Sequence, residues 1–556
     1  MMKGKFAPRN AVLVAALAVC SHSAHAFQFE TEDSDLKIRW DNTVKYSTIY
    51  RLHNPDAAQL AAYKGSPAGD GDRNFKKGIA SNRVDLLSEF DVEKGDSGAR
   101  ISATAWYDSV YGGNNDNTTG LSHNLTTGSN QFNSDTRKAV GQDAKLMDAF
   151  VYTKGEISDM PASVRVGRHT VIYGETLMSG ANGIAAAQGA VDIVKAATVP
   201  GAQVKEFLLP TNQVSATLQP TQKLSLGAYY QFKWERSAFF PAGSFLSPND
   251  ITGPGAQSFL DNAVPFTVPV TADMTPKNGG QWGAQLRYKP EVVDVELGLY
   301  AANYHDKTPS AYYVNVGHNP SIGGGVAPTT FTRVYQQDIR TYGLSASTVL
   351  GSDNVSIETS IRENQPLTGG LCTAPASCGS FIDTTTLLTG GPGFDNKDNP
   401  GYAVGKTSHA TLVDIHIIQP NFILKDGGSV AIQYDWHGVN SVTKNPTMID
   451  PTTTKTASQV TVAFGADYYQ VLDGLDVTIP VTWSHNISGR SRVYVGWVEG
   501  GGSVDTGLNF KYLVNWKGGI NYHHFVGSHG TGIGAGAFNQ TQWDRDYVSF
   551  NLSRGF

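Results

Sequence analysis

Long apolar runs are missing from this sequence of 556 residues. The apolar stretch at residues 11–19 is too short to span a bilayer as a helix, and no other run approaches the roughly 20 residues required. Basic stripes are missing too: the net charge is -6 and only 17% of residues are charged, whereas nucleic-acid binders carry clustered Lys and Arg. The sequence therefore excludes a helical membrane protein and predicts no nucleic-acid partner.

Cysteine is scarce, with three in the chain. Cys372 and Cys378 lie in the loop-like stretch "LCTAPASCGS", and in an exported protein such a pair predicts a disulfide that fixes a surface loop. A two-cysteine metal site is the alternative, but no histidine or carboxylate in that stretch completes the ligand set. Cys20 offers a lipidation site, although Val19 is unfavourable directly before a lipidated cysteine.

The first 26 residues have the features of a secretory signal peptide. Lys3, Lys5 and Arg9 precede the short apolar stretch, and "AHA" at residues 24–26 is a small-x-small cleavage site. The mature chain is predicted to span residues 27–556 and to be exported to the outer membrane of a Gram-negative cell.

Motifs for catalysis are also absent. The chain has no G-x-S-x-G and no H-E-x-x-H, and the histidines at 523, 524 and 529 lie beside a Gly-rich stretch without carboxylates. The best polar cluster is formed by two Asp-x-His pairs, which we expect on the lumen face of neighbouring strands: Asp414, His416, Asp435 and His437. We predict no enzyme, no metal site and no cofactor.

Alternation with a period of two recurs along the chain. In residues 36–50 the even positions carry Leu, Ile, Trp, Val and Tyr, while the odd positions carry Lys, Arg, Asp and Thr. This pattern indicates a strand with one apolar and one polar face. The final residues "VSFNLSRGF" repeat it. A soluble protein would expose this strand as an aggregation-prone edge, so we expect it to close a membrane barrel and to carry the barrel-assembly signal: Val548, Phe550, Leu552 and Phe556.

The connections alternate between short turns and long polar stretches such as "GGNNDNTTGLSHNLTTGSNQFNSD". This asymmetry is typical of transmembrane barrels, with short turns on the periplasmic side and long loops outside. Counting the runs predicts an all-β, antiparallel transmembrane barrel of about 18 strands, with both chain ends on the periplasmic side. A soluble propeller is the alternative, but it has no reason to alternate loop lengths.

One long connection differs from the others. Residues 174–210, here called the inserted segment, read "GETLMSGANGIAAAQGAVDIVKAATVPGAQVKEFLLP" and are too apolar to lie in water. We expect this segment to fold back into the lumen as a plug or constriction, with short helices around residues 185–197 because alanine favours them. It either packs to stabilise a wide barrel or forms a selective constriction for a hydrophobic or amphipathic solute; the two roles are compatible.

Charged residues gather where this segment begins. In "RVGRHTVIYGE" and just beyond it, the predicted lumen or constriction residues are Arg165, Arg168, His169, Glu175, Asp192 and Lys195. Charge is costly on a lipid-facing surface. We therefore expect Arg165 or Arg168 to pair with Glu175 or Asp192 and so hold the segment.

The run from "VGRHTVIYGE" through "AVDIV" and "VPGAQVKEFLLP" to "GAYYQFKW" resembles a family of Gram-negative outer-membrane proteins known as domain of unknown function number thirteen hundred and two. His169 and Tyr173 replace a glutamine and a tryptophan of the family pattern. The resemblance implies a porin-like barrel that handles hydrophobic molecules. It also implies a periplasmic lipoprotein-like partner and an inner-membrane transporter as partners.

Three functions remain open at this point. The chain is an outer-membrane channel or uptake protein for small hydrophobic or amphipathic molecules, a general diffusion porin for polar solutes, or a non-transporting envelope component acting with periplasmic partners. Outer-membrane lipid and the barrel-assembly machinery are expected partners in every case.

Overall fold

The structure is a computed structural model that describes residues 27–29, 35–367, 393–494, 497, 499–530 and 539–556. The predicted signal peptide and the Cys372 and Cys378 pair lie outside these residues and remain predictions. Within the described part of the chain, no helix has the length and apolar character needed to cross a membrane.

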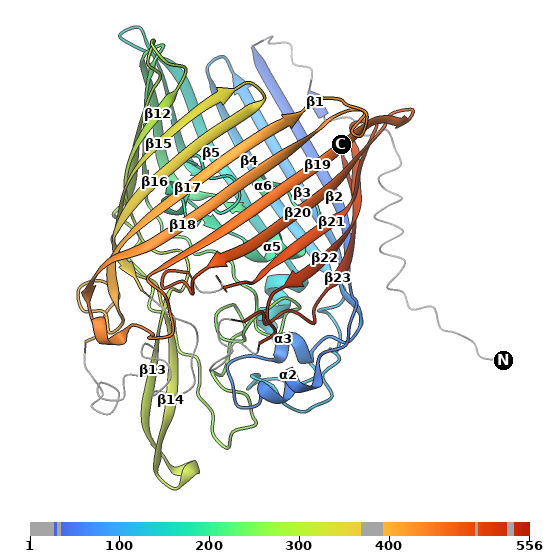
Figure 1. Cartoon of the computed structure of the whole chain (residues 1–556), viewed down its shortest axis with the longest axis vertical. Helices are drawn as coiled ribbons and strands as arrows, with labels where there is room; N and C mark the ends of the chain where they lie inside the picture. Colours follow the sequence, from blue (N-terminus) through green and yellow to red (C-terminus); the bar gives the residue numbers. More distant parts are fainter. Residues whose placement is uncertain (1–26, 30–34, 368–392, 495–496, 498, 531–538) are drawn as a thin grey trace, which may run out of the picture.

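Eighteen antiparallel strands form a closed barrel. Figure 1 shows the barrel from the side. Each strand pairs with its neighbours in the chain, and the last strand pairs with the first long one, which closes the sheet. The predicted fold class and strand number are therefore confirmed. The barrel strands are β2 (Leu36–Arg51), β3 (Gly78–Lys94), β4 (Ser97–Asp108), β5 (Gln142–Ile157), β6 (Met160–His169), β9 (Thr211–Thr221), β10 (Leu224–Gln231), β11 (Gln281–Tyr288), β12 (Glu296–Tyr304), β15 (Ile339–Leu350), β16 (Asp353–Pro366), β17 (Val404–Ile418), β18 (Gly428–Lys444), β19 (Thr456–Leu472), β20 (Leu475–Ser488), β21 (Gly502–Tyr512), β22 (Trp516–Val526) and β23 (Tyr547–Gly555).

Alternation along the strands separates an outer apolar face from a lumen face. On β2, Trp40 and Tyr50 are each 42% exposed on the outside, whereas Lys45 and Ser47 are buried in the lumen. On β23, Phe550 lies opposite Thr48, and its ring is 6.3 Å from that of Tyr46. The backbone of Phe556 exchanges two hydrogen bonds with Asn42, so the end of the chain is paired rather than left as a free edge.

Short turns lie at one end of the barrel and long connections at the other. The C-terminus lies at the short-turn end, at the top of Figure 1. One of these short turns joins β21, which ends at Tyr512, to β22, which begins at Trp516. Leu513 and Val514 form this turn in left-handed conformations, which residues of their type rarely adopt, so the turn lacks the glycine or proline that usually marks one.

The long connections carry short helices and hairpins. Three of them, residues 52–77, 109–141 and 232–280, pack together at the long-loop end and are called the cap. Its core contains Phe75, Tyr111, Phe132 and Phe245. The elements outside the barrel wall and the inserted segment are β1 (Phe27–Phe29), α2 (Ala57–Ala62), α3 (Asp70–Arg73), α4 (Ser134–Thr136), η1 (Arg137–Gly141), β13 (Ala311–Asn319), η3 (Pro320–Ile322), β14 (Gly325–Val334) and η4 (Pro446–Met448).

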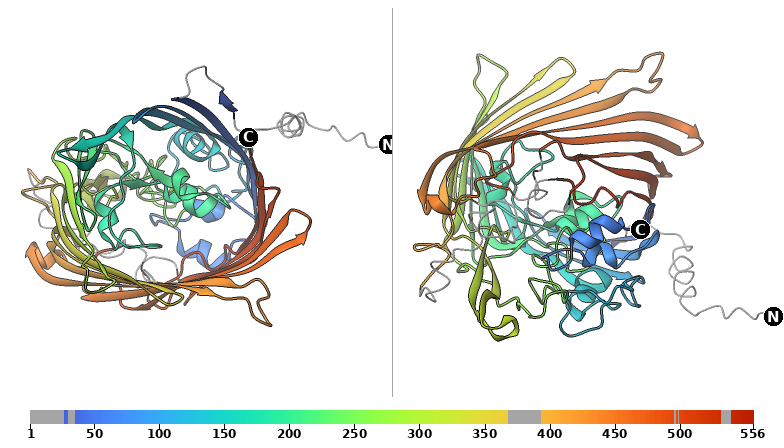
Figure 2. Two further views of the ribbon diagram at one scale, coloured as in Figure 1. Left: turned by 90° about the horizontal axis from the view of Figure 1, so that it is seen from above. Right: turned by 60° about the horizontal axis from the view of Figure 1, so that its bottom comes forward.

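The inserted segment lies between β6 and β9, and Figure 2 shows these residues inside the ring of strands. Its elements are η2 (Ile184–Ala187), β7 (Ala190–Val191), α5 (Ile193–Thr198), α6 (Val204–Phe207) and β8 (Leu208–Leu209). The helices expected around residues 185–197 therefore occur as two short pieces, η2 and α5. Val194 of α5 packs against the core of the cap, so the segment and the cap share one apolar cluster.

Candidate functional site

Two charged residues of β16 hold the first half of the inserted segment. Glu358, only 2% exposed, accepts backbone hydrogen bonds from Glu175 at 2.6 Å and Ile184 at 2.5 Å. Arg362 donates to the carbonyl groups of residues 181, 182 and 183 at 2.8–2.9 Å. A carboxylate thus binds the free N–H groups and a guanidinium binds the free carbonyls, so the polar backbone of this half is satisfied without regular structure.

Gly174 and Gly183 allow the segment to approach Glu358. A Cβ atom on Gly183 would lie 2.8 Å from a carboxylate oxygen of Glu358, and one on Gly174 would overlap the other oxygen. Gly174 also has a φ of 97°, a conformation that L side chains avoid. Both positions therefore require glycine for this contact.

Strands β17 and β18 hold the same half from a second direction. Gln433 accepts backbone hydrogen bonds from Leu177 at 2.9 Å and Met178 at 2.7 Å. The amide of Asn182 contacts Asp435, Thr411 and His409, all of which are buried. These side chains point into the lumen from neighbouring strands. Their hydrogen bonds to the backbone of the segment and to Asn182 fix it to this wall.

The second half of the segment is held at other strands of the barrel. Lys45 of β2 binds Glu206 of α6 at 2.9 Å and the carbonyl of Gly201 at 3.1 Å. Lys195 of α5 lies 3.5 Å from Asp85 of β3 and donates to Thr104 of β4 at 3.2 Å. The segment therefore runs from β16–β18 to β2–β4, with polar contacts on both sides of the lumen.

A lysine just beyond β12 adds a further contact. Lys307 donates to the carbonyl of Ala187 at 3.3 Å, and its ammonium lies 5.4 Å from the Tyr304 ring. Burial lowers the pKa of Lys307 to about 8, partly opposed by the neighbouring Asp306 carboxylate. The Lys307 ammonium group therefore loses its proton more readily than that of an ordinary lysine.

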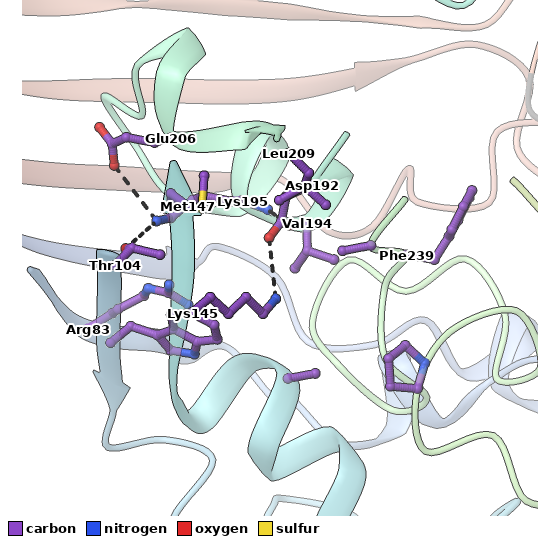
Figure 3. Close-up of a pocket in the computed structure, with 14 residues that line it drawn as sticks. Arg83, Thr104, Lys145, Met147, Asp192, Val194, Lys195, Glu206, Leu209 and Phe239 are labelled. Atoms are coloured by element: carbon purple, nitrogen blue, oxygen red, sulfur yellow. Dashed lines mark hydrogen bonds and ion pairs between the residues drawn. The ribbon is translucent and has the colours of Figure 1, made fainter. Parts of the chain in front are cut away.

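A small cavity of about 70 Å³ remains beside the second half, and Figure 3 shows its lining. Trp106 forms one wall, with Arg83 at 5.1 Å, Lys145 at 4.9 Å and Lys195 at 6.0 Å from its ring centre. The apolar lining is Ala139, Met147, Val194, Leu209, Ala238, Phe239 and Pro254. Lys145 keeps 37% of its side chain exposed and lies 3.9 Å from Asp192. The cavity thus combines an aromatic wall with an accessible ammonium group.

The expected pairing of Arg165 or Arg168 with Glu175 or Asp192 is wrong. Arg168 pairs with Glu235 at 2.8 Å, and Arg165 lies 4.7 Å from the Phe150 ring. The two arginines are three residues apart on one strand, so they point to opposite faces, and only Arg165 points inward.

The other predicted residues of this group do contact the segment or the wall. Glu175 pairs with Arg287 of β11, and Asp192 accepts the backbone N–H of Lys195 at the start of α5. His169 is buried and bonds Ser215 at 2.8 Å, a contact that joins β6 to β9.

The expected cluster of two Asp-x-His pairs is also wrong in part. Asp435 and His437 face the lumen and are 0% and 1% exposed. On β17, however, His409 and Thr411 lie opposite them, so Asp414 and His416 occupy the alternate, outward face. His416 pairs there with Asp353 at 2.6 Å. Successive residues of a strand alternate between the two faces of the sheet, so the Asp435 and His437 pair lies in the lumen while the Asp414 and His416 pair lies outside. The sequence pattern alone did not distinguish the two pairs.

His437 lies 2.7 Å from the hydroxyl of Ser491, a contact that resembles a catalytic dyad. Ser491 also accepts the backbone N–H groups of Val493 and Tyr494 at 3.0 and 2.8 Å, and it is 3% exposed. The hydroxyl is occupied in stabilising a turn and is closed to a substrate, so the contact is structural.

Sequence reasoning missed Glu358, Arg362, Gln433 and Trp106. Their signal is visible in the alternation. In "VSIETSIRENQP" the charges at 358 and 362 share the polar face, and in "ISATAWYD" a tryptophan occupies the polar face with serine and threonine. Large or charged side chains that point into a lumen require a partner there, and the inserted segment supplies it.

Comparison with known proteins gives one family and a set of solved structures. The family described as "Protein of unknown function (DUF1302)" matches residues 7–556. No curated protein matches the chain. Among solved structures, OccAB4 of Acinetobacter baumannii has 12% identity and a TM-score of 0.43, covering 95% of this chain and 98% of that one. OccD3 (OpdP) of Pseudomonas aeruginosa has 10% identity and a TM-score of 0.40, covering 96% and 93%. OmpF of Salmonella typhi, in a complex with daunomycin, has 8% identity and a TM-score of 0.36, covering 95% and 100%.

Proposed function

This chain belongs to the DUF1302 family, and from that premise we propose that it is an outer-membrane channel for small amphipathic molecules, narrowed by the inserted segment. The observation that carries the proposal is the segment's position: it is bonded to β16–β18 on one side and to β2–β4 on the other. A barrel of 18 strands is wide enough for a lumen unless something fills it, so solute selection falls to this segment.

The outer face supports the membrane location. Large apolar side chains such as Ile101 on β4, Leu146 and Val151 on β5, and Leu344 on β15 are 51–57% exposed. Exposed apolar surface of this extent is unfavourable in water and is covered by lipid in a transmembrane barrel. An even number of strands with short turns at one end fits the same location.

The cavity beside Trp106 supports the amphipathic substrate class. Its apolar lining suits a hydrocarbon or ring, while Lys145 presents a partly exposed ammonium group. Three cations, Arg83, Lys145 and Lys195, and two carboxylates, Asp192 and Glu206, line the cavity. The excess positive charge favours amphipathic anions over amphipathic cations. A volume of about 70 Å³ has room for a few water molecules only, so larger solutes require displacement of the residues that line it.

Planar-bilayer recording with purified protein tests the proposal. Hexanoate and glucose serve as an amphipathic anion and a polar control. If the chain is such a channel, we expect small conductance steps that hexanoate blocks and glucose does not. Lys145→Met should weaken the block by hexanoate about tenfold, because a lost charged contact costs roughly 1.4 kcal/mol. Lys233→Met is the matched control, because Lys233 is an exposed lysine that does not line this cavity.

Two outcomes favour other functions. Large steady conductance with equal passage of both solutes would identify a general diffusion porin. Silence from a folded, inserted barrel, and from variants that release the segment, would favour the non-transporting envelope component. The contacts between the barrel wall and the segment support the non-transporting envelope component, because a segment held on both sides of the lumen is also what a permanent plug requires.

A further inference from the structure

We infer that the cap contains a divalent transition-metal site formed by Asp70, His123 and Asp250. These residues come from three different connections: Asp70 from α3 between β2 and β3, His123 from the connection between β4 and β5, and Asp250 from that between β10 and β11. One ligand atom from each lies within 4.8 Å of the others. All three side chains are buried, with exposed fractions of 3%, 1% and 0%. The sequence predicted no metal site, because the three residues are far apart along the chain.

The histidine has the orientation of a metal ligand. Its Nε2 lies 2.8 Å from the carbonyl oxygen of Ser66; because a carbonyl only accepts, Nε2 carries the proton. Nδ1 faces the two carboxylates, to which the neutral ring presents a lone pair, and this buried atom makes no hydrogen bond to any residue that the structure describes. Histidines that bind metals usually donate their other ring N–H to a carbonyl or carboxylate in this way.

The separations fit coordination better than hydrogen bonding. Nδ1 of His123 lies 3.4 Å from an oxygen of Asp70 and 3.4 Å from an oxygen of Asp250. This distance is long for an N–H···O hydrogen bond, which is usually 2.7–3.2 Å. It equals the edge of a tetrahedron with metal–ligand bonds of about 2.0–2.1 Å, the range for Zn²⁺ with imidazole and carboxylate ligands.

The remaining carboxylate oxygens are held in place by other groups. Arg73 donates to the second oxygen of Asp70 at 3.2 Å, and the backbone N–H of Gly243 donates to that of Asp250 at 2.8 Å. Each ligand is therefore oriented by a partner outside the ligand set, which is the arrangement of a preformed site.

The local charge also calls for a dication. Asp70, Asp250 and Asp261 contribute three negative charges, and Arg73, which pairs with Asp70 and Asp261, contributes one positive charge. The adjacent cluster of Arg51, Arg545, Asp72 and Asp544 balances itself. A net charge of about -2 is costly in a buried site, and a divalent ion neutralises it, whereas a protonated His123 would neutralise only half.

Such a site would fix the cap. It would add to the hydrogen bonds and the ion pair that already join the three connections, next to the apolar cluster that includes Val194 of the inserted segment. The metal would therefore stabilise the packing of the cap on the inserted segment. Its role would be structural and not catalytic.

The test uses the full-length protein in detergent, stripped with a chelator and then dialysed against Zn²⁺, with metal content measured by mass spectrometry. We expect about one Zn²⁺ per chain after subtraction of the Zn²⁺ that co-purified lipid binds. His123→Ala and Asp250→Asn should lose this metal and weaken Zn²⁺ binding by at least about 100-fold, more than the loss of an outer partner costs. The control is His53→Ala, an exposed histidine of the same connection as Asp70.

Hydrogen exchange across residues 52–77 provides a second measurement, with Zn²⁺ slowing exchange in the wild type and in His53→Ala only. Folding of every variant is checked by heat-modifiable mobility. If the folded wild type binds no more Zn²⁺ than His123→Ala, and its exchange does not respond to Zn²⁺, the inference is overturned. The cluster is then a protonated histidine between two carboxylates. Transport is not measured in this experiment, so its result is independent of the proposed channel function.

Discussion

Replacing Glu358 by alanine should release the first half of the inserted segment while leaving the barrel intact. The carboxylate accepts two backbone hydrogen bonds, from Glu175 and Ile184, at a site that is 2% exposed. Hydrogen bonds to a charged group contribute about 1.5–3 kcal/mol each. Because the two are coupled through one carboxylate, we expect a loss of about 3 kcal/mol rather than their full sum.

Local opening free energies are read directly from amide hydrogen exchange. A loss of about 3 kcal/mol should speed exchange of the amides at 175 and 184 by about 100-fold, and the release should raise the single-channel conductance. The control is Glu363→Gln on the same strand, because the Glu363 carboxylate pairs with Lys406, whose side chain is 47% exposed. In this variant neither the amide exchange nor the conductance should change. If exchange at residue 184 stays at the wild-type rate in a folded Glu358→Ala barrel, Glu358 does not hold the segment, and the account of the site is wrong.

Three further changes test other parts of the structure. Gly174→Ala adds a Cβ that overlaps Glu358 and strains a φ of 97°; it should destabilise the segment by about 1–3 kcal/mol, measured by exchange of the same amides, whereas Gly113→Ala, with open space at its Cβ, should have no such effect. Lys307→Met should remove a pH dependence of the stability. The pKa of Lys307 is about 8 in the folded chain, below the ordinary 10.5, so the unfolded chain binds more protons between these pH values. The stability of the wild type should therefore rise by about 1–2 kcal/mol from pH 7.5 to 9.5, measured by urea unfolding of both proteins. A wild type that loses stability over this interval relative to Lys307→Met would contradict the assigned shift. Deleting Phe556 removes the two backbone hydrogen bonds to Asn42 and should slow barrel assembly, measured by the folded fraction after refolding, while Ser553→Ala, which keeps the paired backbone, should assemble normally.

Much of the barrel was accessible from the sequence. Alternating residues identified the lipid face and the lumen face of β2 and β23 correctly, because the period of two is a local property of an extended chain. The composition of residues 174–210 likewise indicated a segment that avoids water. The failures occurred where the outcome depends on which residues meet: Arg168 pairs with Glu235, and His416 pairs with Asp353 on the outward face.

The sequence by itself determined that the strands alternate between an apolar and a polar face and that one connection is too apolar for the outside. Only the tertiary structure decided which inward side chains meet. Glu358 and Ile184 are 174 residues apart, and Asp70, His123 and Asp250 come from three separate connections. Their contacts depend on closure of the barrel and on the stagger between its strands, which fix height and angle in the lumen. No local pattern encodes those quantities, since each arises from the pairing of all 18 strands at once.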